Sequence, residues 1–248
     1  MSLTINNLTK SFGQLPVLED MNLQVKDHEF VAILGPSGSG KSTLLQLIGG
    51  LLTPDNGTIQ MNEEKINGQK GLISYMPQNP SLFPWRTVLD NVVLAAELKG
   101  NPDYEEAKLL LKKAGLEEFQ TSYPSELSGG MKQRVAFIRA LLGKQTLLCL
   151  DEPFSALDEF TRIKMQKWLL SIWEENRKSI LFITHSIEEA LFLADRIYVL
   201  SKRPAYVKVE ITIPFSRPRD ESLIAKHEFF QLKQEILQYM KEELNSDD

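Results

Sequence analysis

The chain has 248 residues, of which 42% are hydrophobic and 25% are charged. These proportions are typical of soluble globular proteins and argue against wholesale disorder. There are 28 Lys and Arg residues against 33 Asp and Glu residues, which gives a formal net charge of −5. A mildly acidic chain without a basic block is a poor candidate for non-specific binding to nucleic acid, because phosphate contacts need clustered cations.

Cysteine usage and hydropathy favour a reducing compartment. Cys149 is the only cysteine in the sequence, so neither an intramolecular disulfide nor a cysteine-based metal site can form. Residues 1–7 lack the basic and apolar blocks of a secretory signal. The best apolar run, residues 44–52, is far shorter than the roughly 20 residues that a membrane-spanning helix needs. We therefore expect a soluble protein made in the cytosol.

Short β-branched or alternating runs predict strands in the first third of the chain. The strands expected there are residues 3–8, 22–25, 29–34, 57–61 and 72–76. The run at 30–34 is continuously apolar, as expected for a strand that is buried on both faces. A glycine-rich turn follows this strand, and a helix is predicted from Lys41 to about Leu51.

The middle of the chain has a different character. From about Pro84 to Leu142, apolar residues recur at helical spacing, which predicts a mostly helical insertion. Strands return at residues 146–150, 179–184 and 196–200, with helices at 159–175 and 187–194 between them. Beyond Pro218 the tail reads as an amphipathic helix. Because strands alternate with helices, we expect an α/β protein with a mainly parallel sheet.

A phosphate-binding pattern lies where the buried strand passes into the first helix. Residues 35–42 fit G-x-x-x-x-G-K-[ST], in which glycines let backbone N–H groups converge on phosphate oxygens at a helix N-terminus. Lys41 provides a mobile charge for the outer phosphates, Ser42 is placed to ligate Mg²⁺, and Thr43 can donate to an inner phosphate. The segment predicts a nucleoside-triphosphate site. The residues predicted to bind the nucleotide here are Gly35, Pro36, Ser37, Gly38, Ser39, Gly40, Lys41, Ser42 and Thr43.

The apolar strand near residue 150 ends in two carboxylates, Asp151 and Glu152. Neighbouring side chains on a strand point to opposite sides, so the two carboxylates can have different roles. Asp151 is expected to hold Mg²⁺, through water, as the strand-end Asp does in P-loop NTPases. Glu152 is expected near the γ-phosphate, where it would polarise the attacking water and accelerate the reaction by about 10²–10⁴-fold. Read without the phosphate loop, the same residues could be a turn after a core strand.

A second anion-binding helix start is predicted far from the first, at Ser128, Gly129 and Gly130. Two glycines beside a serine leave bare N–H groups and a hydroxyl at the positive end of a helix. One chain needs only one phosphate loop. A second, distant phosphate receptor therefore suggests that two chains share the nucleotide.

This stretch resembles the signature motif of ATP-binding-cassette (ABC) ATPases, and other segments resemble further motifs of that family in the same order. The resemblance covers residues 3–215. It implies that Gln78 senses Mg²⁺ and the attacking water, and that His185 is the switch histidine near the γ-phosphate. It also implies that Phe12 stacks on adenine, in place of the commoner Tyr. The D-loop, which touches the opposite subunit, is implied to be Ser155, Ala156, Leu157 and Asp158.

The family resemblance also implies a fold and its subdivision. The expected fold is a P-loop NTPase core of the RecA type, with an N-terminal antiparallel β portion and an inserted helical subdomain. Residues 1–248 would form a single ABC ATPase domain. Residues 1–83 and 146–218 would be the nucleotide-binding core, residues 84–145 the helical signature subdomain and residues 219–248 a C-terminal helical tail.

Three further segments are similar to those of one group of importers. Residues 83–92, 201–204 and 214–219 look like the ATPase subunits of nitrate, taurine and aliphatic-sulfonate importers, a group that includes uptake systems for thiamine precursors. Met131 stands where the signature motif usually has Gln, and the variant that ends in Gly-Gly-Met is similar to this group too. The exposed aromatics Phe83 and Trp85 fit a groove for a partner's helix, but packing between domains explains them nearly as well. The arginines near residue 217 are expected on a solvated surface.

The predicted function is therefore that of an ATPase that uses ATP and Mg²⁺ to drive a separate integral membrane permease for a small anion or related solute. Glu152, His185 and Gln78 are the predicted catalytic residues, and Ser42, Gln78 and Asp151 the predicted metal ligands. Two copies would pair in an isologous, ATP-bound homodimer on the cytoplasmic face of the membrane. An extracytoplasmic substrate-binding protein would act indirectly, and no nucleic acid is expected as a partner.

Two alternatives stay open at the level of the sequence. The first is a soluble ABC ATPase that acts on nucleic acid or the ribosome. Such proteins tend to have long coiled coils, zinc-binding cysteines or two cassettes, none of which the sequence shows. The second is a P-loop kinase of a small molecule, which would leave Gly129, Gly130 and Asp158 without a role.

Overall fold

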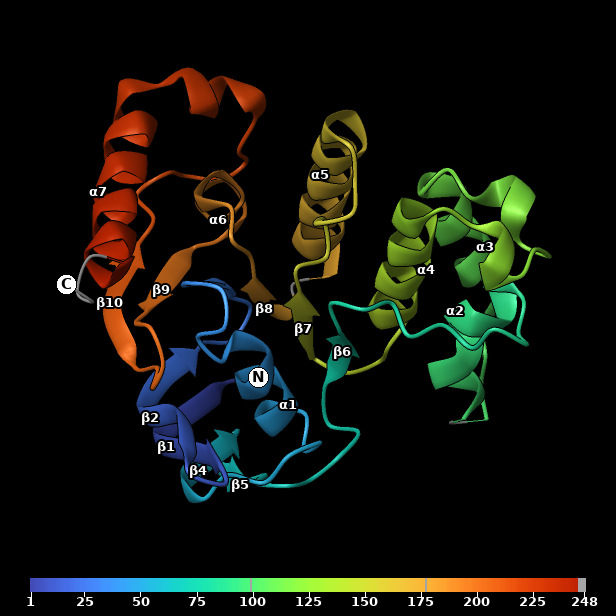
Figure 1. Ribbon diagram of the computed structural model, residues 1–248. Coiled ribbons are helices and arrows are strands. Elements are labelled where there is room, and N and C mark those ends of the chain that lie inside the picture. Colours follow the sequence, from blue (N-terminus) through green and yellow to red (C-terminus); the bar gives the residue numbers. More distant parts are fainter. Residues whose placement is uncertain (99, 177, 245–248) are drawn as a thin grey trace. The chain divides into compact units, whose positions relative to one another are not determined.

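The computed structural model describes residues 1–98, 100–176 and 178–244. The chain divides into two compact units (Figure 1). The first unit comprises the described residues of Met1–Leu72 and Arg177–Asp248, and the second comprises those of Ile73–Asn176. The last four residues of the predicted tail, 245–248, lie outside the described residues. None of the helices in the described ranges combines the length and the apolar character that a bilayer crossing requires.

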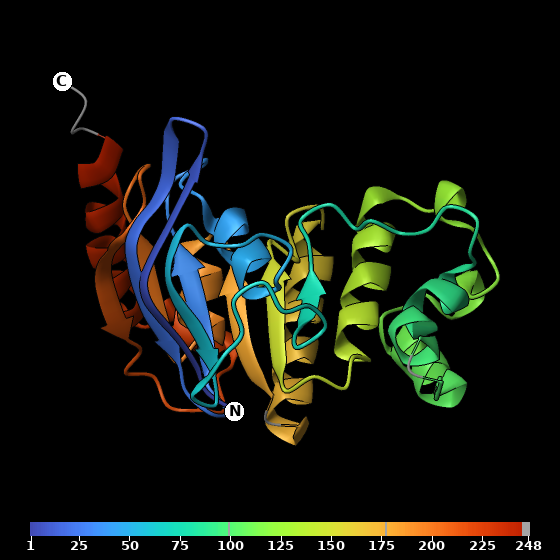
Figure 2. The same ribbon diagram turned by 90° about the horizontal axis from the view of Figure 1, so that it is seen from below.

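The first unit begins with an antiparallel sheet, whose long hairpin is blue in Figure 2. Its strands have the order β2-β1-β4-β5. Alternate side chains of β1, such as Leu3 and Ile5, are buried, because successive side chains on a strand point to opposite faces. The antiparallel N-terminal portion predicted from the family resemblance is therefore confirmed. The bounds are β1 (Leu3–Phe12), β2 (Leu15–Val25), β4 (Asn56–Met61) and β5 (Glu64–Lys65).

A second set of strands in the first unit carries the segments of functional interest. β3 pairs in parallel with both β8 and β9, and β9 pairs antiparallel with β10. Every residue of β3, β8 and β9 is buried, as the apolar runs predict for strands covered on both faces. The bounds are β3 (Phe30–Leu34), β8 (Ser179–Ile183), β9 (Arg196–Leu200) and β10 (Val207–Thr212). The helices of this unit are α1 (Lys41–Ile48), α6 (Ile187–Leu193), η3 (Glu221–Ala225) and α7 (His227–Leu244).

The second unit contains two parallel strands and most of the helices. β6 (Ser74–Met76) and β7 (Leu147–Asp151) are parallel neighbours. Residues 84–145 are mostly helical, and many of their buried side chains belong to one hydrophobic cluster, which includes Val92, Leu111 and Ile138. The helices are α2 (Val88–Glu97), α3 (Tyr104–Lys113), η1 (Glu117–Phe119), η2 (Pro124–Glu126), α4 (Gly129–Leu141) and α5 (Glu159–Asn176).

Three local differences from the predicted elements have physical reasons. The first helix ends at Ile48, not near Leu51, because Gly49 is its C-cap and Gly50 adopts a φ of 68°. β2 begins seven residues earlier than predicted, since its pattern is interrupted where Asp20 adopts a φ of 49°. β10 was not predicted. Its charged residues Lys208 and Glu210 interrupt the apolar pattern, as is typical of an edge strand.

A buried arginine joins three strands of the first unit. The Arg196 side chain is 8% exposed and makes a bidentate ion pair with Glu29, with N–O distances of 2.9 and 2.7 Å. It also donates to Glu210 at 2.7 Å and to the carbonyl of Gln24 at 2.8 Å. Burial acts to lower the pKa of Arg196, but the hydrogen bonds to Glu29 and Glu210 raise that pKa above its ordinary value. Arg196 therefore stays charged, and each of its guanidinium nitrogens donates a hydrogen bond.

Replacing this arginine should destabilise the chain. We expect Arg196→Met to lower the free energy of unfolding by about 3 kcal/mol, because it leaves the largely buried Glu29 carboxylate unpaired. Glu210→Gln is the matched control, and because the Glu210 side chain is 47% exposed it should cost less than about 1 kcal/mol. Urea denaturation measures both values, and equal losses for the two variants would contradict this account.

Candidate functional site

The phosphate loop of the first unit joins β3 to α1. Gly38 and Gly40 adopt φ values of 76° and 96°, in the left-handed region that favours glycine. A Cβ added at Gly40 would lie 2.8 Å from Cγ1 of Val17 and 3.0 Å from Cδ2 of Leu18. The loop thus packs directly on β2 at a point where only glycine fits.

Lys41 is the first residue of α1, and its ammonium group lies inside the loop. The residue is 8% exposed, and Nζ donates to the carbonyls of Gly35 at 2.9 Å and Pro36 at 2.7 Å. Gly40, the N-cap of α1, offers no side-chain cap to the first turn. Backbone donors at the positive end of a helix and a nearby ammonium form the arrangement that binds phosphate groups.

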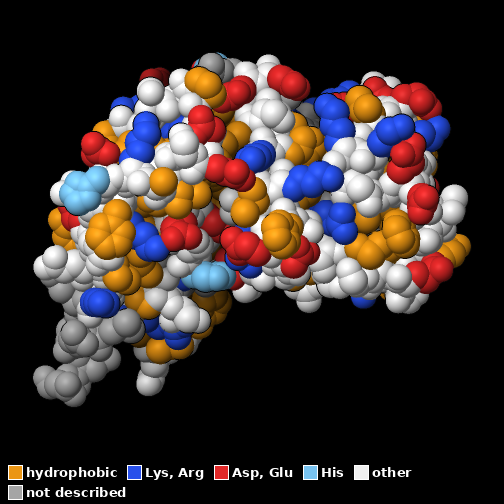
Figure 3. Space-filling model, turned by 90° about the horizontal axis from the view of Figure 1, so that it is seen from above, with side chains coloured by type: hydrophobic (Ala, Val, Ile, Leu, Met, Phe, Trp, Pro, Cys, Tyr) orange, Lys and Arg blue, Asp and Glu red, His pale blue; other side chains and the backbone are white. Residues whose placement is uncertain are grey.

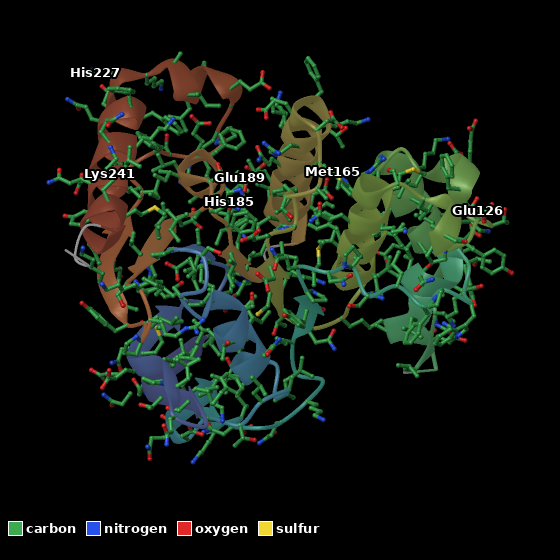
Figure 4. All side chains as sticks on the ribbon, in the orientation of Figure 1. Glu126, Met165, His185, Glu189, His227 and Lys241 are labelled. Atoms are coloured by element: carbon green, nitrogen blue, oxygen red, sulfur yellow. The ribbon has the colours of Figure 1, made fainter. Side chains whose placement is uncertain are left out.

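His185 lies at the same edge of the strands as the phosphate loop. β3 and β8 are parallel, so their carboxyl ends lead to Gly35 and to Thr184 on the same side. His185 is exposed, and it precedes Ser186, the N-cap of α6, whose Oγ accepts from the N–H of Glu189 at 3.3 Å. The Glu189 carboxylate in turn accepts from Oγ1 of Thr184. Figure 4 labels His185 and Glu189 beside each other at the start of α6.

Phe12 lies at the end of β1, and 48% of its surface is exposed. Nζ of Lys10 lies 5.6 Å from the centre of its ring. Lys10 is fixed by Asp55 at 2.8 Å and by the carbonyl of Thr53 at 2.8 Å. The structure therefore presents Phe12 as an accessible aromatic face with a defined position, as a base-stacking residue requires.

In the second unit, Gln78 and Glu152 lie close together. Met76 and Leu150 are partners in the parallel pair β6 and β7, so the residues that follow both strands emerge at one edge. Nε2 of Gln78 donates to Oε2 of Glu152 at 3.1 Å. Asp151 is 2% exposed at the end of β7, while Glu152 is half-buried. Glu152 adopts a φ of 47°, which is costly for a residue with a Cβ and typical of functional sites.

The predicted signature segment begins α4 with an open end. Ser128 is the N-cap, and its Oγ accepts from the N–H of Met131 at 3.3 Å. A Cβ added at Gly129 would meet no atom within 4 Å, whereas one at Gly130 would lie 3.2 Å from the carbonyl oxygen of Ala156. Met131 packs against the hydrophobic cluster of this unit. The face of the helix start at Gly129 is therefore available to a ligand.

The predicted D-loop residues, 155–158, connect β7 to α5. Leu157 is buried, and Ser155, Ala156 and Asp158 are exposed. Oδ1 of Asp158 accepts from the N–H of Thr161 at 3.0 Å, and hydrogen bonds from Thr161 lower the pKa of Asp158. Asp158 thus acts as a helix cap, which is a structural role that its predicted contact with a second subunit does not exclude.

Sequence reasoning missed two residues of α4 that hold the loops around Gln78 and Glu152. The buried Gln133 side chain donates to the carbonyl of Glu152 at 2.9 Å and accepts from the N–H of Ala156 at 2.9 Å. Arg139 donates to the carbonyls of Ser81 at 3.0 Å and Pro80 at 2.7 Å. Burial lowers the pKa of Arg139. No local pattern indicates these contacts, since their partners are 19 to 59 residues away.

The arginines near residue 217 are not a solvated surface, so that expectation is wrong. The Arg219 side chain is 2% exposed and donates to the carbonyls of Leu191, Phe192 and Ala194 at the end of α6. Arg217 donates to the carbonyl of Leu193 at 2.6 Å. Burial lowers the pKa of Arg219 to about 10, so it stays charged at neutral pH and stabilises the negative end of the helix.

Cys149 is completely buried in β7. Burial raises the pKa of its thiol above the ordinary value, which disfavours the reactive thiolate. Cys149 is therefore a small core residue, as the sequence indicates.

A phosphate loop between a buried strand and a helix, with a carboxylate pair at the end of another strand, defines a P-loop nucleotide-binding protein. Comparison with known proteins gives the family. The ABC transporter family model matches residues 18–155, more than half of the chain. The chain belongs to the ABC transporter family.

Curated relatives match over most of their length. The formylaminopyrimidine import ATP-binding protein of Halalkalibacterium halodurans is 45% identical over 80% of this chain and 79% of its own. The nitrate import ATP-binding protein of Synechocystis sp. is 43% identical over 95% of this chain and 90% of its own. The taurine import ATP-binding protein of Escherichia coli O157:H7 is 44% identical over 87% and 86%, respectively.

A solved structure supports the fold. A dimeric ATP-binding cassette in a post-hydrolysis state, bound to ADP and phosphate, is 33% identical, with a TM-score of 0.78. It covers 86% of this chain, and all of its own chain is matched. The predicted family, fold and class, an ATP-hydrolysing import subunit, are therefore confirmed.

The contacts of Gln133 give a testable prediction. Gln133→Met keeps the size of the side chain but removes the donor to Glu152 and the acceptor for Ala156. We expect kcat for ATP hydrolysis to fall by about 10-fold to 100-fold, because Glu152 is the predicted catalytic base and a small displacement of such a group is costly, while ATP affinity stays within about twofold. Lys132→Met, one residue earlier in α4, is the matched control and should keep its activity. Steady-state kinetics decides, and unchanged kcat in Gln133→Met would refute a role for this contact.

Proposed function

We propose that the chain energises a separate membrane permease in an importer for a small anion or a related solute, and that two copies share each ATP. The observation that carries this proposal is the open helix start at Gly129, in a chain that already has a complete phosphate loop. A second anion receptor has no use in a single-chain kinase. It is useful if another copy supplies the nucleotide.

In the proposed cycle, the phosphate loop binds ATP. Lys41 donates to the outer phosphates, the amides of residues 38–43 surround the inner ones, and Phe12 stacks on adenine. The fixed position of Lys41 inside the loop and the exposed ring of Phe12 support these roles.

Mg²⁺ would be held by Ser42, Asp151 and Gln78 together with the phosphates. When bound, the ion neutralises charge that develops on the phosphates. The described residues contain no group of three or more His, Cys, Asp or Glu side chains that could hold a metal ion by themselves. The proposed ligands Ser42, Asp151 and Gln78 include one carboxylate. They fit Mg²⁺, which is usually bound by one or two carboxylates, substrate phosphates and water rather than by an all-protein cage. A buried carboxylate at Asp151 supports the assignment.

Glu152 would accept a proton from the attacking water, with Gln78 orienting that water and His185 contacting the γ-phosphate. The hydrogen bond from Gln78 to Glu152 supports a shared task, because it fixes the direction of the carboxylate. The constrained backbone of Glu152 supports it further.

Ser128, Gly129 and Gly130 would close over the γ-phosphate of the ATP held by the partner copy, and residues 155–158 would touch that copy. ATP then favours the closed homodimer because it contacts two chains there and one chain otherwise. The dimeric state of the similar ATP-binding cassette supports this step.

The helical residues 84–145 would transmit this motion to the permease, with residues 1–83 and 146–218 as the nucleotide-binding core and 219–248 as the tail. The chain would then work at the cytoplasmic face of the membrane. The exposed pair Phe83 and Trp85, whose ring centres are 5.1 Å apart, supports a protein contact there. On the face shown in Figure 3, acidic and basic side chains are interspersed, which does not favour nucleic acid as a partner.

The relatives give the cargo class only in outline. Their names specify nitrate, taurine and formylaminopyrimidine. The first two are or contain a small oxyanion, and the third is a neutral pyrimidine. A small anion or a related solute is therefore the proposed cargo, and a permease that copurifies with the chain would identify it.

Replacing the proposed catalytic base gives the first test of this function. Glu152→Gln keeps the size and the hydrogen-bonding capacity of the side chain but cannot take up a proton. We expect the rate of ATP hydrolysis to fall by at least about 100-fold, with ATP-bound dimers accumulating in size-exclusion chromatography. Glu159→Gln, an exposed carboxylate near the start of α5, is the control. Hydrolysis by Glu152→Gln at the parent rate would count decisively against the assignment.

Substitution of Gly129 tests the shared site. The space around Gly129 admits a larger side chain within its own copy, so Gly129→Leu should leave the unfolding transition and the single-chain affinity for ATP unchanged. Hydrolysis should fall by at least about tenfold, because the side chain would occupy the place of the partner's phosphate. Calorimetric titration and a phosphate-release assay measure the two quantities. If ATP affinity is lost instead, the two-chain site is wrong.

A further inference from the structure

A turn after β9 contacts the phosphate loop from outside. Arg203 lies in this turn, residues 201–206, and its Nε and Nη2 donate to the carbonyl oxygen of Gly38 at 3.1 and 2.5 Å. The residue is exposed. Two charge-assisted donors on one carbonyl form a directional contact that fixes the orientation of a peptide group.

The peptide group between Gly38 and Ser39 is held at both ends. Its carbonyl accepts from Arg203, and its N–H, on Ser39, donates to the carbonyl of Pro36 at 3.3 Å. The same Pro36 carbonyl accepts from Nζ of Lys41 at 2.7 Å. A continuous chain of hydrogen bonds thus runs from Arg203 through the loop to the ammonium group that is proposed to bind the outer phosphates.

The turn itself is firmly attached. Ala205 donates to the carbonyl of Val17 at 2.9 Å and accepts from the N–H of Glu19 at 3.0 Å. Val17 is also the residue that packs against Gly40 of the loop. A Cβ added at Gly35 would lie 3.1 Å from Cβ of Leu200, the last residue of β9. β9, the turn and β2 therefore support the loop at Gly35, Gly38 and Gly40, respectively, and Arg203 reaches the loop from a turn that is itself held in place.

We propose that Arg203 is a positioning residue for nucleotide binding, which pre-organises the phosphate loop for the phosphates of a nucleoside di- or triphosphate. This inference rests on the proposed ATP-binding role of the loop. Gly38 has no side chain to restrict its φ of 76°, so without Arg203 the peptide could adopt more orientations. Ordering it would then be a cost of binding.

This role predicts a specific pattern of kinetic effects. The loop surrounds phosphates that ATP and ADP share, so loss of Arg203 should weaken both ligands by the same factor. Once the loop is filled, the reacting groups are unchanged, and kcat at saturating ATP should be preserved. A residue that touched the reacting phosphate would instead lower kcat.

The experiment compares Arg203→Met and Arg203→Lys with the full-length parent. Arg203→Met keeps much of the side chain without its donors, and we expect Kd for ATP and for ADP to rise by about three- to tenfold. KM should rise with kcat within about twofold of the parent. Arg203→Lys keeps a donor but not the planar fork and should recover part of the affinity. Lys70→Ala, which removes an exposed positive charge from the same unit, is the control and should bind as the parent does.

Each outcome has a defined meaning. If the parent itself binds no ATP, the proposed function fails, whatever Arg203 does. If the parent binds ATP and Arg203→Met binds it equally well, only the positioning role is overturned. A fall in kcat at unchanged KM would also overturn the positioning role. So would a lower unfolding temperature of nucleotide-free Arg203→Met, if the loss of folded protein accounts for the weaker binding.

Discussion

The organisation of the phosphate loop depends on the buried ammonium group of Lys41. A cation removed from water is costly unless polar groups surround it, and here the carbonyls of Gly35 and Pro36 provide that environment. These carbonyls follow a strand whose residues are all buried, so the hydrophobic core of the first unit fixes their position. The close approach of β2 at Gly40 and of the turn with Arg203 at Gly38 then leaves the loop little freedom. Core packing and charge placement therefore act together.

In the second unit, α4 has the corresponding organising role. Its first turn presents Gly129, its second holds the peptide of Glu152 through Gln133, and its last fixes the segment after Gln78 through Arg139. A helix is stiff over this length, because each residue is tied to the next turn by a backbone hydrogen bond. A displacement at the start of α4 is therefore transmitted to the loop of Glu152 and to the segment that follows Gln78.

The sequence predicted those features that depend on local patterns. The continuous apolar runs located β3, β7, β8 and β9, and parallel pairing explains why Gln78 and Glu152, far apart in the sequence, meet at one edge. The edge strand β10 was not predicted because the charged residues Lys208 and Glu210 interrupt its apolar pattern. The roles of Arg203 and Arg219 were not predicted because they contact backbone carbonyls of other elements. These carbonyls lie 165 residues away for Arg203 and 25 to 28 residues away for Arg219. Any residue type can supply such an acceptor, so no motif marks it.

The arginines that precede α7 change how the end of the chain should be regarded. Arg217 and Arg219 donate to carbonyls of the last turn of α6. Lys233 of α7 adds an ion pair with Glu188 of α6. His185 lies directly before α6, so Arg217, Arg219 and α7 support the helix that follows this histidine. Shortened versions for crystallisation or fusion should keep residue 219 and preferably α7, because a cut further upstream would remove the contacts that hold α6, the helix that follows His185.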